Sequence, residues 1–134
     1  MVHEAVHLLL DRRGILSATT APIWLSEGIA ASFEPVEPER SFGPDRIINA
    51  RTAVFREGLR ERRTPSVRTL ICWRHDAART DVHLHYAAAA SLCSWLVRNR
   101  PDELRAYLRS FRDGTGVPVT PTEDLARFED CFGD

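Results

Sequence analysis

The 134-residue sequence contains no lysine, and all 18 of its basic residues are arginine. We interpret this as a compositional bias of the source genome rather than as a functional feature. An excess of charge of one sign is also lacking, because 19 acidic residues leave a net charge of −1. Without a positive excess, the sequence gives no reason to expect nucleic acid or an anionic membrane as a partner.

Cysteine is sparse: Cys72, Cys93 and Cys131 are odd in number and no pair has CxxC spacing. This pattern indicates neither a disulfide framework nor a cysteine zinc site. Cys93 lies in a helical pattern, so we expect it to be a small core residue. No apolar run reaches the roughly 20 residues of a membrane span. We therefore expect neither a membrane segment nor a signal peptide in these residues.

Strand patterns are lacking as well, and the apolar residues recur at helical spacing. The sequence predicts a single mainly α domain over residues 1–134, with about six helices and no N-terminal β-sheet. The expected helices cover about 2–13, 23–33, 45–62, 82–98, 102–112 and 121–132, and residues 65–73 are expected to be short helical or irregular. Asp81 is a candidate N-cap, and Thr120 with Glu123 matches a capping box.

The apolar positions of these helices predict which side chains face the core. The expected inward set includes Val6, Leu9, Leu10, Val54, Phe55, Leu59, Val67, Leu70, Ile71, Leu84, Ala88, Leu92, Trp95, Leu96, Leu104, Tyr107, Leu108, Phe111, Leu125 and Phe128. Five arginines of the third helix and its end lie mostly on the opposite side: Arg51, Arg56, Arg60, Arg62 and Arg63. A basic groove for an acidic ligand and a solvated face both fit this pattern. The interspersed glutamates favour the solvated face.

The motif that organises the chain is the sequence HEAVH at residues 3–7, a match to HExxH. Residues four apart on a helix lie only about 40° apart around its axis. His3 and His7 therefore project from one face and are candidate ligands of one metal ion. Glu4 lies beside them and is a candidate general base for a metal-activated water.

A zinc hydrolase uses three protein ligands and leaves the fourth position for water. The best third candidate is Glu27, in the sequence WLSEGIA at residues 24–30. Gly14 is expected to end the first helix and Pro22 to begin the second. The resulting helical hairpin would bring Glu27 alongside the two histidines, and the small residues beside Glu27, including Gly28, would let the two helices approach closely.

HEAVH followed by WLSEGIA resembles the gluzincin metallopeptidases, and is most similar to the peptidase-MA-like domains of bacterial proteins. The resemblance covers roughly residues 1–115 and includes a later helix that opens with Tyr86 and a run of small residues. It implies the helical half of a zincin-like domain, with Zn²⁺ bound by His3, His7 and Glu27, and with Glu4 as the base. The implied reaction is hydrolysis of a peptide bond in a peptide or protein substrate.

Other polar residues near these motifs have weaker assignments. The resemblance places Tyr86 facing the metal, where its phenol could stabilise the oxyanion of the tetrahedral intermediate. His83 and His85 flank Tyr86 and could do the same, although a surface position is expected for each. Ser26 is expected to lie on the helix surface or behind a metal ligand, because no G-x-S-x-G pattern surrounds it.

The chain opens two residues before His3, whereas in the family a small β-sheet and an earlier helix start precede this point. We expect an N-terminally truncated fragment rather than a reduced domain. A catalytically inactive, peptidase-like binding module is the competing hypothesis for function. An arginine-rich nucleic-acid binder is disfavoured by the net charge.

Overall fold

The computed structural model describes residues 2–17, 19–34, 50–74, 81–112 and 117–133. Within these ranges the chain forms seven helices and no strand, which confirms the mainly α prediction. The helices are α1 (Val2–Arg12), α2 (Ile23–Ser32), α3 (Ala50–Arg60), α4 (Val67–Ile71), α5 (Val82–Asn99), α6 (Pro101–Arg109) and α7 (Pro121–Phe132).

The described helices number one more than expected, because residues 65–73 contain the short helix α4. Ser66 caps this helix by accepting a hydrogen bond from the backbone N–H of Thr69 at 3.1 Å. The N-cap at Asp81 and the capping box of Thr120 and Glu123 are both confirmed. The predicted start of the third helix at Asp45 lies outside the described residues.

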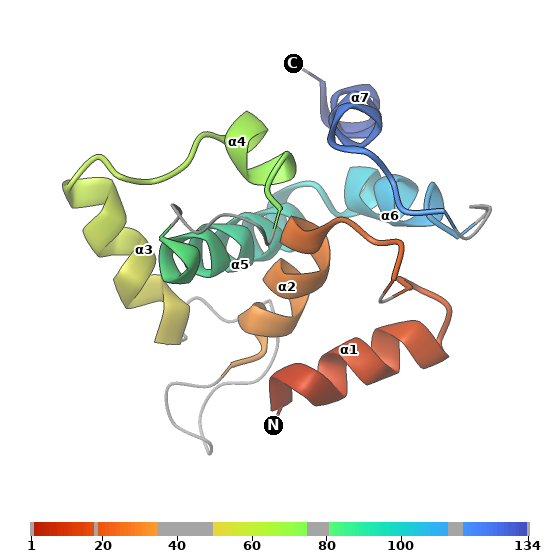
Figure 1. The fold of residues 1–134 in the computed structure, drawn as a ribbon, viewed down its shortest axis with the longest axis horizontal. Coiled ribbons are helices and arrows are strands. Elements are labelled where there is room, and N and C mark those ends of the chain that lie inside the picture. Colours follow the sequence, from red (N-terminus) through yellow and green to blue (C-terminus); the bar gives the residue numbers. More distant parts are fainter. Residues whose placement is uncertain (1, 18, 35–49, 75–80, 113–116, 134) are drawn as a thin grey trace.

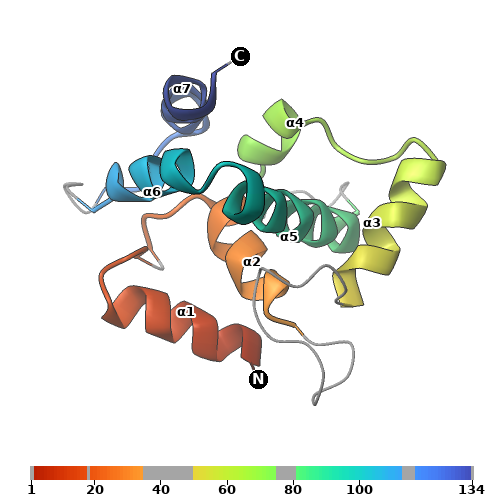
Figure 2. The same cartoon turned by 180° about the vertical axis from the view of Figure 1, so that it is seen from behind.

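Helix α5 runs through the middle of the molecule, and α2 and α3 pack along it (Figure 1). Helix α1 packs against α2 and lies at the outside of the molecule, as the view from behind also shows (Figure 2). Helices α6 and α7 pair beyond the C-terminal end of α5, and α4 contacts α2, α5 and α7. The face of α1 that meets α2 is therefore the place where a site shared by these two helices can form.

Helices α2 and α5 approach very closely at Gly28. A Cβ atom at this position would lie 2.7 Å from the carbonyl oxygen of Ala89 and 2.8 Å from the Sγ atom of Cys93. Residues 87–90 of α5 are all alanine and are at most 4% exposed, so this part of α5 is thin. The expectation that Gly28 lets α1 and α2 approach is wrong, because the glycine faces α5 instead. Cys93 is buried, as predicted.

Several side chains that were expected to be buried are exposed. Leu9 is 55% exposed because α1 packs on one side only, and Leu9 lies about 100° around the helix from Leu10, which contacts the core. Val67 and Trp95, 48% and 50% exposed, line a shallow apolar hollow of about 270 Å³ between α3, α4 and α5. Val54 and Leu59 of α3 are also exposed.

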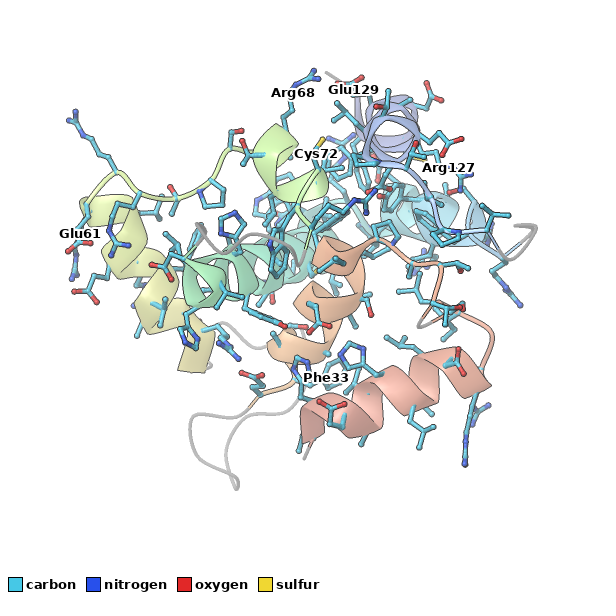
Figure 3. The ribbon with its side chains drawn as sticks, viewed as in Figure 1. Phe33, Glu61, Arg68, Cys72, Arg127 and Glu129 are labelled. Atoms are coloured by element: carbon cyan, nitrogen blue, oxygen red, sulfur yellow. The ribbon has the colours of Figure 1, made fainter. Side chains whose placement is uncertain are left out.

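The remaining packing ties the C-terminal helices together. Figure 3 shows Arg68 of α4 next to Glu129 of α7, and the Arg68 Nη2 atom donates to the Glu129 carboxylate at 2.8 Å. Trp24, Tyr107 and Phe128 form an aromatic cluster between α2, α6 and α7, with ring centroids 5.7 to 5.9 Å apart. Among the described helices, none is both long and apolar enough to cross a membrane.

Candidate metal centre

His3 and His7 of α1 and Glu27 of α2 come together, as the helical hairpin predicted. Their side chains are between 16 and 18% exposed, so the group is shielded but reachable from solvent. The Nε2 atom of His3 lies 3.0 Å from Glu27 Oε2 and 3.0 Å from His7 Nε2. The Nε2 atom of His7 lies 3.5 Å from Glu27 Oε1.

These separations suit one tetrahedral ion. A zinc ion with ligand distances of about 2.0–2.1 Å holds its ligand atoms about 3.3 Å from one another. The three residues form a group that could hold a metal ion, with each offering one ligand atom. Two imidazoles and a carboxylate are a donor set that zinc commonly takes in hydrolases.

The other ring nitrogens of the two histidines have their own partners. His3 Nδ1 lies 2.9 Å from Glu34 Oε1, and His7 Nδ1 lies 3.1 Å from Ser26 Oγ. An ionised carboxylate can only accept hydrogen bonds, so His3 Nδ1 must be the donor to Glu34. In a neutral His3 the Nε2 atom then carries a lone pair that faces a second acceptor, the Glu27 carboxylate. A cation between them, either a metal ion or a proton, removes this conflict.

Glu34 is itself held by Arg51 of α3. The Arg51 Nε atom donates to Glu34 Oε2 at 2.6 Å, and its Nη2 atom donates to Oε1 at 3.0 Å. Burial alone would raise the pKa of Glu34, but the hydrogen bond and charge of Arg51, followed by those of His3, outweigh it and lower this pKa. Glu34 is therefore ionised at neutral pH and fixes His3 in the tautomer described above.

Tyr86 of α5 also reaches the group. Its ring centroid is 6.2 Å from that of His3. Burial raises the pKa of Tyr86, and the negative charge of Glu27 raises it further, so the phenol stays protonated and can donate. Tyr86 is thus placed beside a candidate ligand, on the side predicted from the sequence.

The two histidines that flank Tyr86 point elsewhere. The ring of His85 packs against Trp73, with centroids 5.3 Å apart, and its Nδ1 atom lies 3.1 Å from the carbonyl oxygen of Asp81. His83 is exposed near the start of α5. Of the three residues considered for oxyanion stabilisation, the structure brings only Tyr86 to the His3–His7–Glu27 group.

Glu4 is exposed on α1, about 60° around the helix from His7. Glu4 follows His3 directly in the chain and therefore lies at the same end of α1 as the two histidines. Ser26 contacts His7 Nδ1, so its expected position behind a metal ligand agrees with the structure.

Sequence analysis missed Glu34 and misplaced Arg51. Glu34 follows Glu27 by seven residues, close to two helical turns, so both carboxylates lie on one side of α2 and its extension. That spacing was a usable signal. Arg51 was assigned to a solvated face, whereas it pairs with Glu34 at the edge of the site. No fixed spacing connects α3 to α1, so the sequence carried no signal for this contact.

Comparisons with curated proteins and with solved structures found no match for this chain. One family model matches residues 1–120, and its description is "Protein of unknown function (DUF1570)". The match includes α1 to α6 and every residue of the candidate metal centre. The chain therefore belongs to the DUF1570 family.

Proposed function

We propose that this chain is a zinc-dependent metallopeptidase domain that hydrolyses peptide bonds. The observation that carries the proposal is the convergence of the His3 and His7 Nε2 atoms and the Glu27 carboxylate, with each pair of groups 3.0 to 3.5 Å apart at its nearest given atoms. The HExxH motif supports the same assignment, because it places a glutamate next to the two histidines.

His3, His7 and Glu27 would hold the ion, and the fourth position would remain open for water. A zinc ion supplies Lewis acidity, which polarises a carbonyl group and lowers the pKa of a water molecule to about 7. Glu4 would accept the proton of that water on its carboxylate and pass it to the leaving amine. Tyr86 would donate its phenolic proton in a hydrogen bond to the developing oxyanion.

The hydrogen-bond partners of the two histidines also support a stable site. Glu34 and Ser26 would orient the imidazoles of His3 and His7 through their Nδ1 atoms. The substrate class that suits this chemistry is a peptide or protein.

A Glu4→Gln variant tests the catalytic assignment. It keeps the size of the side chain and all three proposed ligands, so zinc content should equal that of the wild type. Removing the base should slow cleavage of a mixed quenched-fluorescent peptide library by about 10²–10⁴-fold. Asp11→Asn removes the same charge from the far end of α1 and serves as the control, with wild-type cleavage expected. Wild-type cleavage by Glu4→Gln, or a zinc-loaded wild type that cleaves none of the peptides, contradicts the proposal.

A further inference from the structure

The ion pair between Glu34 and Arg51 connects α3 to the candidate metal centre. The two side chains are 23% and 21% exposed, so the pair is shielded far better than the surface pair of Arg63 and Glu61, in which both side chains are about half exposed. Surface pairs of the latter kind contribute little to stability. The Arg51–Glu34 pair instead lies against a candidate metal ligand.

Arg51 determines the orientation of the Glu34 carboxylate. Its Nε and Nη2 atoms donate to different carboxylate oxygens, at 2.6 and 3.0 Å, in the planar fork that arginine forms with a carboxylate. The oxygen that accepts from Nη2, Oε1, is also the one that faces His3 Nδ1 at 2.9 Å. Rotation of the carboxylate would therefore break contacts to both neighbours.

The same guanidinium contacts the other side of the site. Its Cζ atom lies 5.2 Å from the ring centroid of Tyr86, a cation–π distance. Tyr86 in turn packs against His3, with the two ring centroids 6.2 Å apart. Arg51 thus touches two neighbours of the candidate ligand His3, Glu34 and Tyr86. Lysine, a point charge without a planar fork, could not make both contacts in this geometry.

We propose that Arg51 is a positioning residue for the metal centre, acting chiefly through Glu34 on the imidazole of His3. This inference rests on the proposed zinc site. It predicts that α3, which contributes no ligand, controls how tightly the ion is held. Loss of an outer partner of a ligating histidine typically weakens metal binding by about 10–100-fold.

The test measures the zinc dissociation constant of the folded chain by competition with a chromophoric chelator. Glu34→Gln should weaken zinc binding by about 10–100-fold, and Arg51→Met by about tenfold. If Arg51 acts through Glu34, the double variant should bind zinc about as tightly as Glu34→Gln alone, because coupled residues are not additive. Arg56→Met, which removes an exposed arginine five positions further along α3, is the matched control and should leave the constant unchanged.

Arg51→Lys keeps the positive charge and provides a second test if the Arg51→Met variant does not fold. The fork is lost, so zinc binding should still weaken, and the visible absorption of the Co²⁺-loaded chain should change as His3 reorients. The inference is overturned if Arg51→Met and Arg51→Lys bind zinc as tightly as the wild type, or if the losses of the two single variants add in the double variant. A wild type that binds no zinc overturns both the proposed function and this inference. A wild type that binds zinc, with Arg51 variants that bind it equally tightly, overturns this inference alone.

Discussion

Asp124 is a buried carboxyl group, 1% exposed, between two aromatic donors. It accepts hydrogen bonds from the indole Nε1 of Trp24 at 2.9 Å and from the hydroxyl of Tyr107. These contacts join α7 to α2 and α6, inside the aromatic cluster described above. Trp24 and Tyr107 are both fully buried, so removal of Asp124 would leave their polar groups unsatisfied.

Asp124→Ala should therefore lower the free energy of unfolding by about 2–5 kcal/mol, measured by urea denaturation. Asp124→Asn keeps one carbonyl oxygen as acceptor and should cost less than alanine. Asp130→Ala, an exposed carboxyl on the same helix, is the control and should change stability little. Equal stability of Asp124→Ala and the wild type would show that the two hydrogen bonds contribute nothing.

The same residue predicts a dependence of stability on pH. Burial raises the pKa of Asp124 above that of an ordinary carboxyl, and the hydrogen bonds from Tyr107 and Trp24 only partly offset this. The folded state then binds the proton more tightly than the unfolded state. The contribution of Asp124 is fully present below the unfolded pKa and is lost as pH rises through the raised folded pKa. The stability of the wild type relative to Asp124→Asn should therefore decrease from acid to neutral pH.

For individual residues, the sequence predicted the candidate metal ligands better than the residues that hydrogen-bond or support these ligands. His3 and His7 share a helix face by spacing alone, and the predicted turn from Gly14 to Pro22 brought Glu27 to them. Gly14 has the positive φ of 61° expected at a helix end. The contact of Arg51 depends on how α3 lies against α5, and that information is absent from any local pattern.

The packing of α2 on α5 is the feature of the fold that depends most on a single small residue. At Gly28 an added Cβ atom would meet backbone of α5, which cannot move aside as a flexible side chain could. The alanines of residues 87–90 keep the facing surface of α5 flat. Because α2 carries Glu27, separation of these helices would also shift a candidate ligand.

Gly28→Ala should lower the free energy of unfolding by about 1–3 kcal/mol, the usual cost of overpacking. Thermal and urea denaturation of the variant would measure the loss. The opposite result is also informative: in a helix interior that could accommodate the methyl group, alanine would stabilise by about 1 kcal/mol through its higher helix propensity. An unchanged or increased stability would therefore contradict the close contact.

The presence of the helices and their N-caps could be predicted from the local sequence. Which apolar side chains are buried could be predicted less well. Asp81 and Thr120 cap their helices through side-chain oxygens, as their positions before apolar patterns indicated. Trp95 and Val67 were assigned inward because they are apolar, yet they line an open hollow. An apolar side chain favours a buried position, but it is buried only where another element of the structure covers it.

For the whole molecule, the class of fold followed from the helical periods and from the lack of strand patterns. The sequence could not specify that α5 is central and that α1 is attached mainly through α2. This arrangement leaves two of the candidate ligands, His3 and His7, in the first two turns of a peripheral helix. The third, Glu27, lies on a well-packed helix, so the two halves of the site differ in how firmly they are held.

The arrangement of the whole chain also explains why binding of an ion should affect stability. An ion shared by α1 and α2 would fasten the peripheral helix to the packed part of the molecule. A ligand that binds only the folded state stabilises it by mass action. Added zinc should therefore raise the thermal midpoint of the wild type, and a chelator should reverse the increase.

The central claim is that His3, His7 and Glu27 form a three-ligand metal site, and the metal content of the purified chain tests it most directly. Inductively coupled plasma mass spectrometry should find about one zinc per wild-type chain. The zinc should be lost in Glu27→Ala but retained in Glu57→Ala, which removes an exposed glutamate of α3. A folded wild type without zinc, or a Glu27→Ala variant that keeps it, would contradict the account.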